Sequence, residues 1–243
     1  MQFLRAAWRL LRSVLHVMHG VLIVARFPAL DAAGRRECVQ RWSAGLVRSV
    51  GANLQVTGVP RQGATLIVAN HVSWLDIAAI HAAAPHARFV SKADVLRWPL
   101  LGRLIRSAGT LFIERERKRD AVRVVHAMAQ ALQDGDTVAV FPEGTTGAGP
   151  ELLPFHANLL QAAVATGTPV QPVGLRFADA LQPFSPAVVY LGSTTLAQSI
   201  WRVVSATGLS VHVQLLAPIA SAHADRRALA AHLRELIAER LPP

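Results

Sequence analysis

From Asn53 onward, short apolar runs alternate with segments of helical periodicity, and this alternation constrains the fold more than any other feature of the chain. The expected strands are residues 54–58, 65–69, 88–92, 109–113, 137–141, 170–177, 187–191 and 209–216. The expected helices are residues 74–84, 98–107, 121–133, 155–166, 195–205 and 225–240. Strands that alternate with helices form largely parallel sheets. The sequence therefore predicts an α/β fold, with a largely parallel mixed sheet covered by helices on both faces.

The segment before this pattern, residues 3–26, has the periodicity of one amphipathic helix. Its basic and histidine positions recur at steps of three and four residues and share a face: Arg5, Arg9, Arg12, His16 and His19. The longest uncharged run, 13–25, is shorter than the about 20 residues that span a bilayer. A basic helix that carries a tryptophan, Trp8, is typical of a segment lying in the membrane interface. The alternative is a helix packed on the domain core.

A second helix is expected over residues 32–50, with Asp31 as its N-cap. It carries Trp42 and several arginines. Two basic helices with tryptophans favour docking on an anionic membrane surface. We therefore divide the chain into amphipathic membrane-docking helices, 1–48, and an α/β domain, 49–243.

The charge of the chain indicates an anionic partner. The 25 basic and 15 acidic residues give a net charge of +10, which fits nucleic acid or an anionic membrane. No basic recognition helix is present and aromatic residues are only 6%, so no nucleic acid is expected. The single cysteine, Cys38, excludes an internal disulfide and fits a reducing compartment. No zinc-type spacing occurs, and no metal is expected.

A histidine lies where one apolar strand passes into a helix. His71 follows the run 66–69, and Asp76 falls in the first turn of the next helix, where its carboxylate can reach back to the imidazole. Such a carboxylate fixes the tautomer and leaves the other nitrogen free to take a proton. The alternative is a capping box, with Ser73 as the cap and Asp76 supporting the first turn.

Two further motifs follow strands. Arg115 comes just after the strand at 109–113, where an arginine can bind an anion, although a solvated charged turn is the alternative. Phe141-Pro142-Glu143-Gly144-Thr145 places a carboxylate and a glycine turn after another strand; its simpler interpretation is a strand-ending turn. Ligands bind beyond the carboxyl ends of parallel strands. We therefore expect His71, Arg115 and Glu143 to converge on one crevice, which favours catalysis over capping.

Together these motifs resemble the glycerolipid acyltransferase family typified by 1-acyl-sn-glycerol-3-phosphate acyltransferase. Four blocks occur in the family's order: Asn70-His71 to Asp76, Gly109 to Arg115, Phe141 to Thr145, and Val170 to Val173. The resemblance covers about residues 50 to 215, and the two helices in front resemble the family's membrane-docking helices. His-x4-Asp alone is a weak signal, but in this order and spacing the set is specific.

The resemblance implies a role for each matched residue. His71 would be the general base and Asp76 its orienting partner. Arg115 would hold the acceptor head group, while Glu143, Gly144 and Thr145 would shape its site. Lys92 lies where the family often has a basic residue near the phosphate.

The implied reaction moves an acyl group from an acyl-carrier-protein or coenzyme A thioester, as co-substrate and without a cofactor, to a lysolipid hydroxyl in a single step. The expected acceptor is 1-acyl-sn-glycerol-3-phosphate, giving phosphatidic acid. The enzyme would lie on membrane lipids at the cytoplasmic face of the inner membrane, as a monotopic or peripheral protein.

One position departs from the family pattern. The family usually continues Phe-Pro-Glu-Gly-Thr with an arginine that helps bind phosphate, and this chain has Thr146. The loss of a bidentate phosphate ligand leaves a second acceptor open, such as a lyso-ornithine lipid, whose head group has no phosphate. A non-catalytic membrane-binding protein is a further alternative, which would explain the N-terminal helices but not the motifs that follow the strands.

Overall fold

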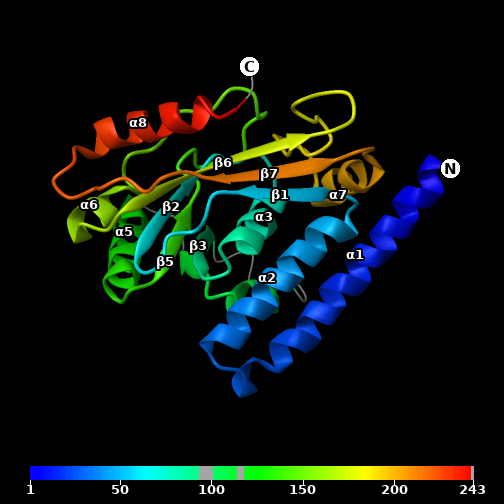
Figure 1. Cartoon of the computed structure of the whole chain (residues 1–243), viewed down its shortest axis with the longest axis horizontal. Coiled ribbons are helices and arrows are strands. Elements are labelled where there is room, and N and C mark those ends of the chain that lie inside the picture. Colours follow the sequence, from blue (N-terminus) through cyan, green and yellow to red (C-terminus); the bar gives the residue numbers. More distant parts are fainter. Residues whose placement is uncertain (93–100, 114–117, 242–243) are drawn as a thin grey trace.

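The computed structural model describes residues 1–92, 101–113 and 118–241, and its centre is one seven-stranded sheet (Figure 1). The strands are β1 (Asn53–Thr57), β2 (Thr65–Ala69), β3 (Ala87–Lys92), β4 (Leu111–Ile113), β5 (Thr137–Val140), β6 (Val170–Ala178) and β7 (Ser210–Leu215). Their order is β1-β7-β6-β2-β5-β3-β4. Every pairing is parallel except that of β6 with β7, which is antiparallel. The predicted largely parallel, mixed sheet is confirmed.

Helices cover both faces of this sheet, as predicted (Figure 1). They are α1 (Gln2–Ala25), α2 (Ala32–Ser49), α3 (Leu75–Ala83), α4 (Leu101–Ser107), α5 (Lys118–Gln133), α6 (Gln161–Thr166), α7 (Leu196–Ser205) and α8 (Arg226–Ala238). Side chains of a strand alternate between faces. In β2, Ile67 and Ala69 therefore pack with α1, α2, α3 and α7. Leu66 and Val68 pack with α5, α6 and α8 on the other face.

Two predicted elements are wrong. Residues 187–191 form no strand; they lie in a loop in which Val188 is buried against the core, so the apolar run supplies packing instead of pairing. The helix predicted over 155–166 begins only at Gln161. The residues before it are held in a loop, because the His156 N–H donates to the carbonyl of Pro142 at 2.8 Å.

The arginines of α1 bond to the ends of two other helices and to the loop after one of them. Arg9 donates to the carbonyl of Ala206 at 2.6 Å, at the C-terminus of α7. Arg12 donates to the carbonyl of Ser49 at 2.9 Å, at the C-terminus of α2. Arg5 donates to a hydroxyl in the loop after α7. Cations at helix C-termini satisfy free carbonyls and oppose the helix dipole. This face of α1 therefore packs on the rest of the protein, as the second alternative for the helix predicts.

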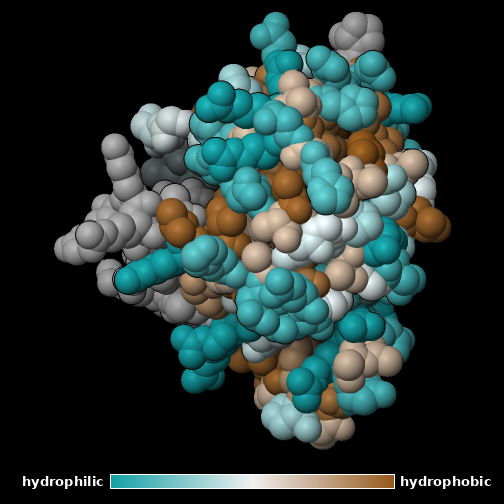
Figure 2. Space-filling view, turned by 90° about the vertical axis from the view of Figure 1, so that its left-hand side faces the viewer, coloured by the Kyte–Doolittle hydropathy of each residue, from teal (hydrophilic) through white to brown (hydrophobic). Residues whose placement is uncertain are grey.

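The surface that α1 leaves exposed is apolar. Its exposed large side chains are Phe3, Leu4, Trp8, Leu11, Val14, Leu15, Met18 and Leu22. By length and composition alone, α1 is long and apolar enough to cross a membrane. Figure 2 shows a contrasting face, on which hydrophobic residues are scattered among hydrophilic ones. The apolar surface of α1 therefore fits association with a membrane.

Candidate active site

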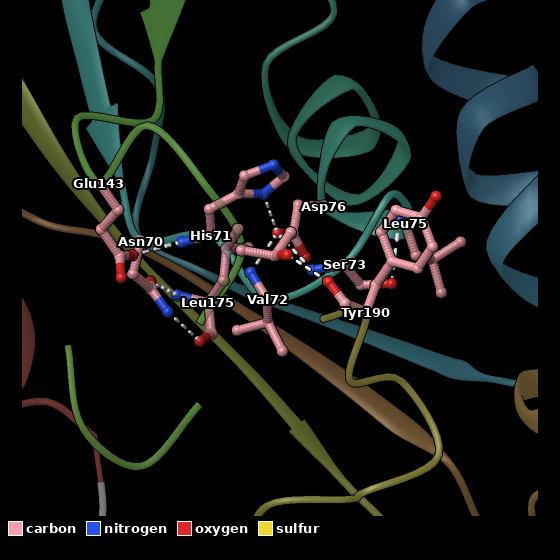
Figure 3. Close-up of polar contacts among 10 residues, drawn as sticks. Asn70, His71, Val72, Ser73, Leu75, Asp76, Glu143, Leu175 and Tyr190 are labelled. Carbon is pink, nitrogen blue, oxygen red and sulfur yellow. Dashed lines mark hydrogen bonds and ion pairs between the residues drawn. The ribbon is translucent and has the colours of Figure 1, made fainter. Parts of the chain in front are cut away.

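His71 and Asp76 meet at the carboxyl end of β2 (Figure 3). His71 Nδ1 lies 2.7 Å from Asp76 Oδ2, and the Asp76 side chain is fully buried whereas that of His71 is 21% exposed. Because a carboxylate only accepts, Nδ1 carries the proton and Nε2 is the unprotonated nitrogen. Nε2 forms no hydrogen bond with the residues that the structure describes. The predicted contact is present, and it engages Nδ1 while Nε2 stays free of the described residues.

The capping interpretation holds for Asp76, which supports the turn before α3, but not for Ser73 as the cap. Its Oδ2 accepts from the N–H groups of Val72, at 2.7 Å, and Ser73, at 2.9 Å. Ser73 is not the N-cap; that position belongs to Trp74, which makes no side-chain cap. One carboxylate oxygen thus holds both the turn before α3 and the imidazole.

An aromatic column supports the imidazole on one side. The rings of His71 and Phe141 are stacked, with centroids 4.0 Å apart and an angle of 10° between their planes. Phe89 stacks on Phe141 at 5.6 Å, and the buried His81 meets the ring of Phe89 edge-on at 4.9 Å. In the sequence Phe141 is only the first residue of the motif 141–145, and its place beside His71 depends on the pairing of β2 with β5.

Glu143 lies under the His71 turn (Figure 3). It is 4% exposed, and its Oε1 accepts from the His71 N–H at 2.7 Å while its Oε2 accepts from the Leu153 N–H at 2.9 Å. Burial raises the pKa of the Glu143 carboxyl, and the two backbone donors act against that shift. Both oxygens are therefore engaged with the backbone.

The loop after this motif is attached to the site. Gly144 adopts φ +71°, the conformation that glycine tolerates best, and Thr145 is exposed. The Gly147 N–H donates to the carbonyl of His71 at 2.7 Å. The Thr146 hydroxyl donates to the carbonyl of Tyr190, so it faces the 186–194 loop. The loop that follows Thr146 is therefore tied to His71 at its first residue.

Of the two predicted basic ligands, only Lys92 falls within the described backbone. Lys92 ends β3, where its backbone is paired with Ile113 of β4. Arg115 falls outside the described residues, two positions after β4 ends. The order β2-β5-β3-β4 puts the ends of β2 and β4 three strand spacings apart, about 14 Å.

Comparison with known proteins finds acyltransferases that are similar to this chain over most of its length. A model of the acyltransferase family matches residues 53–176. A lyso-ornithine lipid O-acyltransferase of Pseudomonas aeruginosa is 37% identical, over 87% of this chain and 81% of its own. The chain belongs to the acyltransferase family. A 1-acyl-sn-glycerol-3-phosphate acyltransferase of Neisseria meningitidis serogroup B is 38% identical, over 71% of this chain and 67% of its own.

The fold is also known from a solved structure. The crystal structure of the 1-acyl-sn-glycerophosphate acyltransferase PlsC from Thermotoga maritima matches with a TM-score of 0.76, over 99% of this chain and 96% of that one, at 19% identity. At that identity the likeness concerns the fold. The relatives and the family model together make this chain an acyltransferase of lysolipids.

Proposed function

We propose that His71 is the general base of a direct acyl transfer. Nε2 takes the proton of the acceptor hydroxyl, and the oxygen attacks the thioester carbonyl of the donor. The C–S bond then breaks, and the imidazolium returns its proton to the departing thiolate. The products are an ester and a free thiol, so no acyl-enzyme forms. The observation that carries this proposal is the 2.7 Å contact of Nδ1 with Asp76, which leaves Nε2 as the base.

Of the other motif residues, some are proposed to bind the acceptor and one holds the backbone of the site. Arg115 and Lys92 remain proposed ligands of the acceptor head group. Thr145 is exposed beside the site, and its N–H forms no hydrogen bond within the described part of the chain, so it can face an anion. The Gly144 N–H is used inside the turn, donating to Phe141 at 3.1 Å. We assign Glu143 to the scaffold, because both of its oxygens hold backbone amides.

For the acceptor we propose a lyso-ornithine lipid, with 1-acyl-sn-glycerol-3-phosphate as the second candidate. Position 146 offers a neutral hydroxyl that is already bonded to Tyr190, so it supplies no cation for a phosphate. The relative named for lyso-ornithine lipid matches 87% of the chain, against 71% for the relative named for the phosphate-bearing acceptor. The donor is an acyl-carrier-protein or coenzyme A thioester, and no cofactor takes part.

A competition assay tests the acceptor. Purified protein in detergent receives equal amounts of the two lysolipids, with a long-chain acyl thioester of acyl carrier protein or of coenzyme A as donor. We expect ester product from the lyso-ornithine lipid, and Thr146→Arg should raise the share of phosphatidic acid. Exclusive phosphatidic acid formation by the unchanged protein would reverse the order of the candidates. Silence with both acceptors and both donors would contradict the proposed reaction.

We further propose that the apolar surface of α1 holds the enzyme on the cytoplasmic face of the inner membrane. Leu15 is 54% exposed on that surface, and Val122 is 56% exposed on α5. Leu15→Glu should weaken flotation with anionic liposomes, whereas Val122→Glu should not. Equal flotation of both variants would contradict docking through α1. Protection of a C-terminal tag from external protease in spheroplasts would place the domain in the cytoplasm, and digestion there would contradict that placement.

A further inference from the structure

We infer that Arg234, on the C-terminal helix α8, is a positioning residue for His71, acting through the backbone at Leu153 and the carboxylate of Glu143. Arg234 lies outside the stretch that matches the family model, 53–176. The inference rests on the proposed role of His71 as the base. It concerns what keeps that base in place.

The first link joins Glu143 to two backbone segments. Its carboxylate bridges the N–H of His71, at 2.7 Å, and the N–H of Leu153, at 2.9 Å. Glu143 is almost completely buried, so neither bond is easily replaced by water. The position of the Leu153 amide therefore affects the position of Glu143, and through it the backbone of His71.

The second link joins Arg234 to the same loop. Its Nη2 donates to the carbonyl of Leu152 at 2.6 Å, and its Nε donates to the carbonyl of Leu153 at 3.1 Å. Two guanidinium donors in fixed geometry restrain the loop more than a single donor would. Leu152 is also buried against Ile237, one turn farther along α8. The loop is thus held from α8 by polar and apolar contacts.

The third link joins α8 to β2, the strand that carries His71. Leu229, Ala230 and Leu233 of α8 lie in one buried cluster with Leu66 and Val68 of β2. Arg234 follows directly after the fully buried Leu233, so its backbone is fixed relative to that strand. His71 is therefore held twice. One connection is its own strand, and the other runs through α8, Arg234, the Leu153 backbone and Glu143.

Loss of the guanidinium would break this second connection. The carbonyls of Leu152 and Leu153 would lose charged donors, and the Leu153 amide would be free to leave Glu143. The Glu143 carboxylate would then bond only to the His71 N–H and would itself be less firmly held. The imidazole would therefore spend less time in its reactive geometry. Small displacements of a reacting group lower the rate of the chemical step more than they lower binding. We expect kcat to fall while KM stays nearly constant.

Steady-state kinetics of the full chain in detergent test this inference. Arg234→Gln should lower kcat about tenfold with KM changed less than about twofold, and Arg234→Lys should recover part of the loss. Arg227→Gln is the matched control, because Arg227 is exposed on the same helix and its side chain bonds to neither Leu152 nor Leu153 in the described structure. This control should keep the kcat of the unchanged protein.

A double-mutant cycle separates positioning from general destabilisation. If Arg234 acts through Glu143, adding Arg234→Gln to Glu143→Gln should lower kcat little further, because the carboxylate bridge between the His71 and Leu153 amides is already broken. Thermal melts verify folding, and Arg234→Lys replaces Arg234→Gln in the cycle if the latter melts below the assay temperature. The inference would be overturned if the kcat losses of the two single variants multiplied in the double variant. It would also be overturned if Arg234→Gln left kcat unchanged or raised KM alone. Acyl transfer retained by His71→Ala would instead overturn the proposed function, so the two failures are distinct.

Discussion

The imidazole of His71 lies flat against the ring of Phe141, with the two ring centroids 4.0 Å apart. Aromatic pairs of this kind contribute about 0.5–1.5 kcal/mol beyond the area that they bury. Here the stack and the bond to Asp76 restrain the imidazole from different sides. The ring of Phe141 thus limits rotation of the base about its own side chain.

Replacing that ring should slow the reaction. Phe141→Leu keeps an apolar side chain but removes the stacked face, and we expect kcat to fall about 3- to 10-fold, corresponding to the energy of such a pair. Phe141→Tyr keeps the ring and should retain most of the activity. Steady-state kinetics with a saturating donor measure both variants. Full kcat in Phe141→Leu would show that the stack has no part in positioning.

Arg12 should contribute to the stability of the fold. Its guanidinium caps the C-terminus of α2 through the carbonyls of Arg48 and Ser49. Arg12→Ala should lower the free energy of unfolding by about 1–2 kcal/mol, as charged hydrogen bonds do. Arg36→Ala, at an exposed position of α2, is the control. Urea unfolding in detergent compares the two, and equal stabilities would contradict the capping role.

The stability of the protein should fall in mild acid because of His81. Burial, and to a smaller extent the nearby His86, lower the pKa of His81 to about 4. The unfolded chain, with a histidine pKa of about 6.5, binds more protons between those values. The contribution of neutral, buried His81 to the free energy of unfolding is therefore complete above about pH 6.5 and is lost as pH falls towards 4. Between pH 7 and pH 5 this one group accounts for about 2 kcal/mol.

The His81→Phe variant tests this pH dependence. It keeps a ring against Phe89 but cannot be protonated, so its free energy of unfolding should change less between pH 7 and pH 5. His232→Gln, on the exposed surface of α8, should behave like the unchanged protein. Denaturant titrations at the two pH values provide the comparison. An identical slope in His81→Phe would show that another group titrates in this range.

Much of the fold could be predicted from local pattern. Apolar runs such as 65–69 are strands because they are buried on both faces, and Asp31 caps α2 through the N–H of Gly34 as its type suggests. The run at 187–191 looked the same but lies in a loop, since composition alone does not distinguish pairing from packing. The partners of the α1 arginines could not be predicted for a similar reason. Periodicity put them on one face without indicating that two helix ends lie against it.

The candidate site was predictable only in its local part. Asp76 is five residues from His71, so their contact follows from one turn of chain. Glu143 and Phe141 reach His71 because β2 pairs with β5, and Arg234 reaches the site across 82 residues. Such contacts depend on the tertiary arrangement, which a single sequence does not display. Arg115 lies outside the described residues, so its place in the site stays a prediction.

The most direct test of the account is the acyl transfer rate of His71→Ala, measured with a lysolipid acceptor and an acyl thioester donor. Loss of a general base lowers such a rate about 10²–10⁴-fold. We expect transfer to fall by that factor while flotation on liposomes and the thermal melt stay unchanged, because His71 is partly exposed and belongs to the turn after β2, not to α1. Transfer at the rate of the unchanged protein would contradict the account.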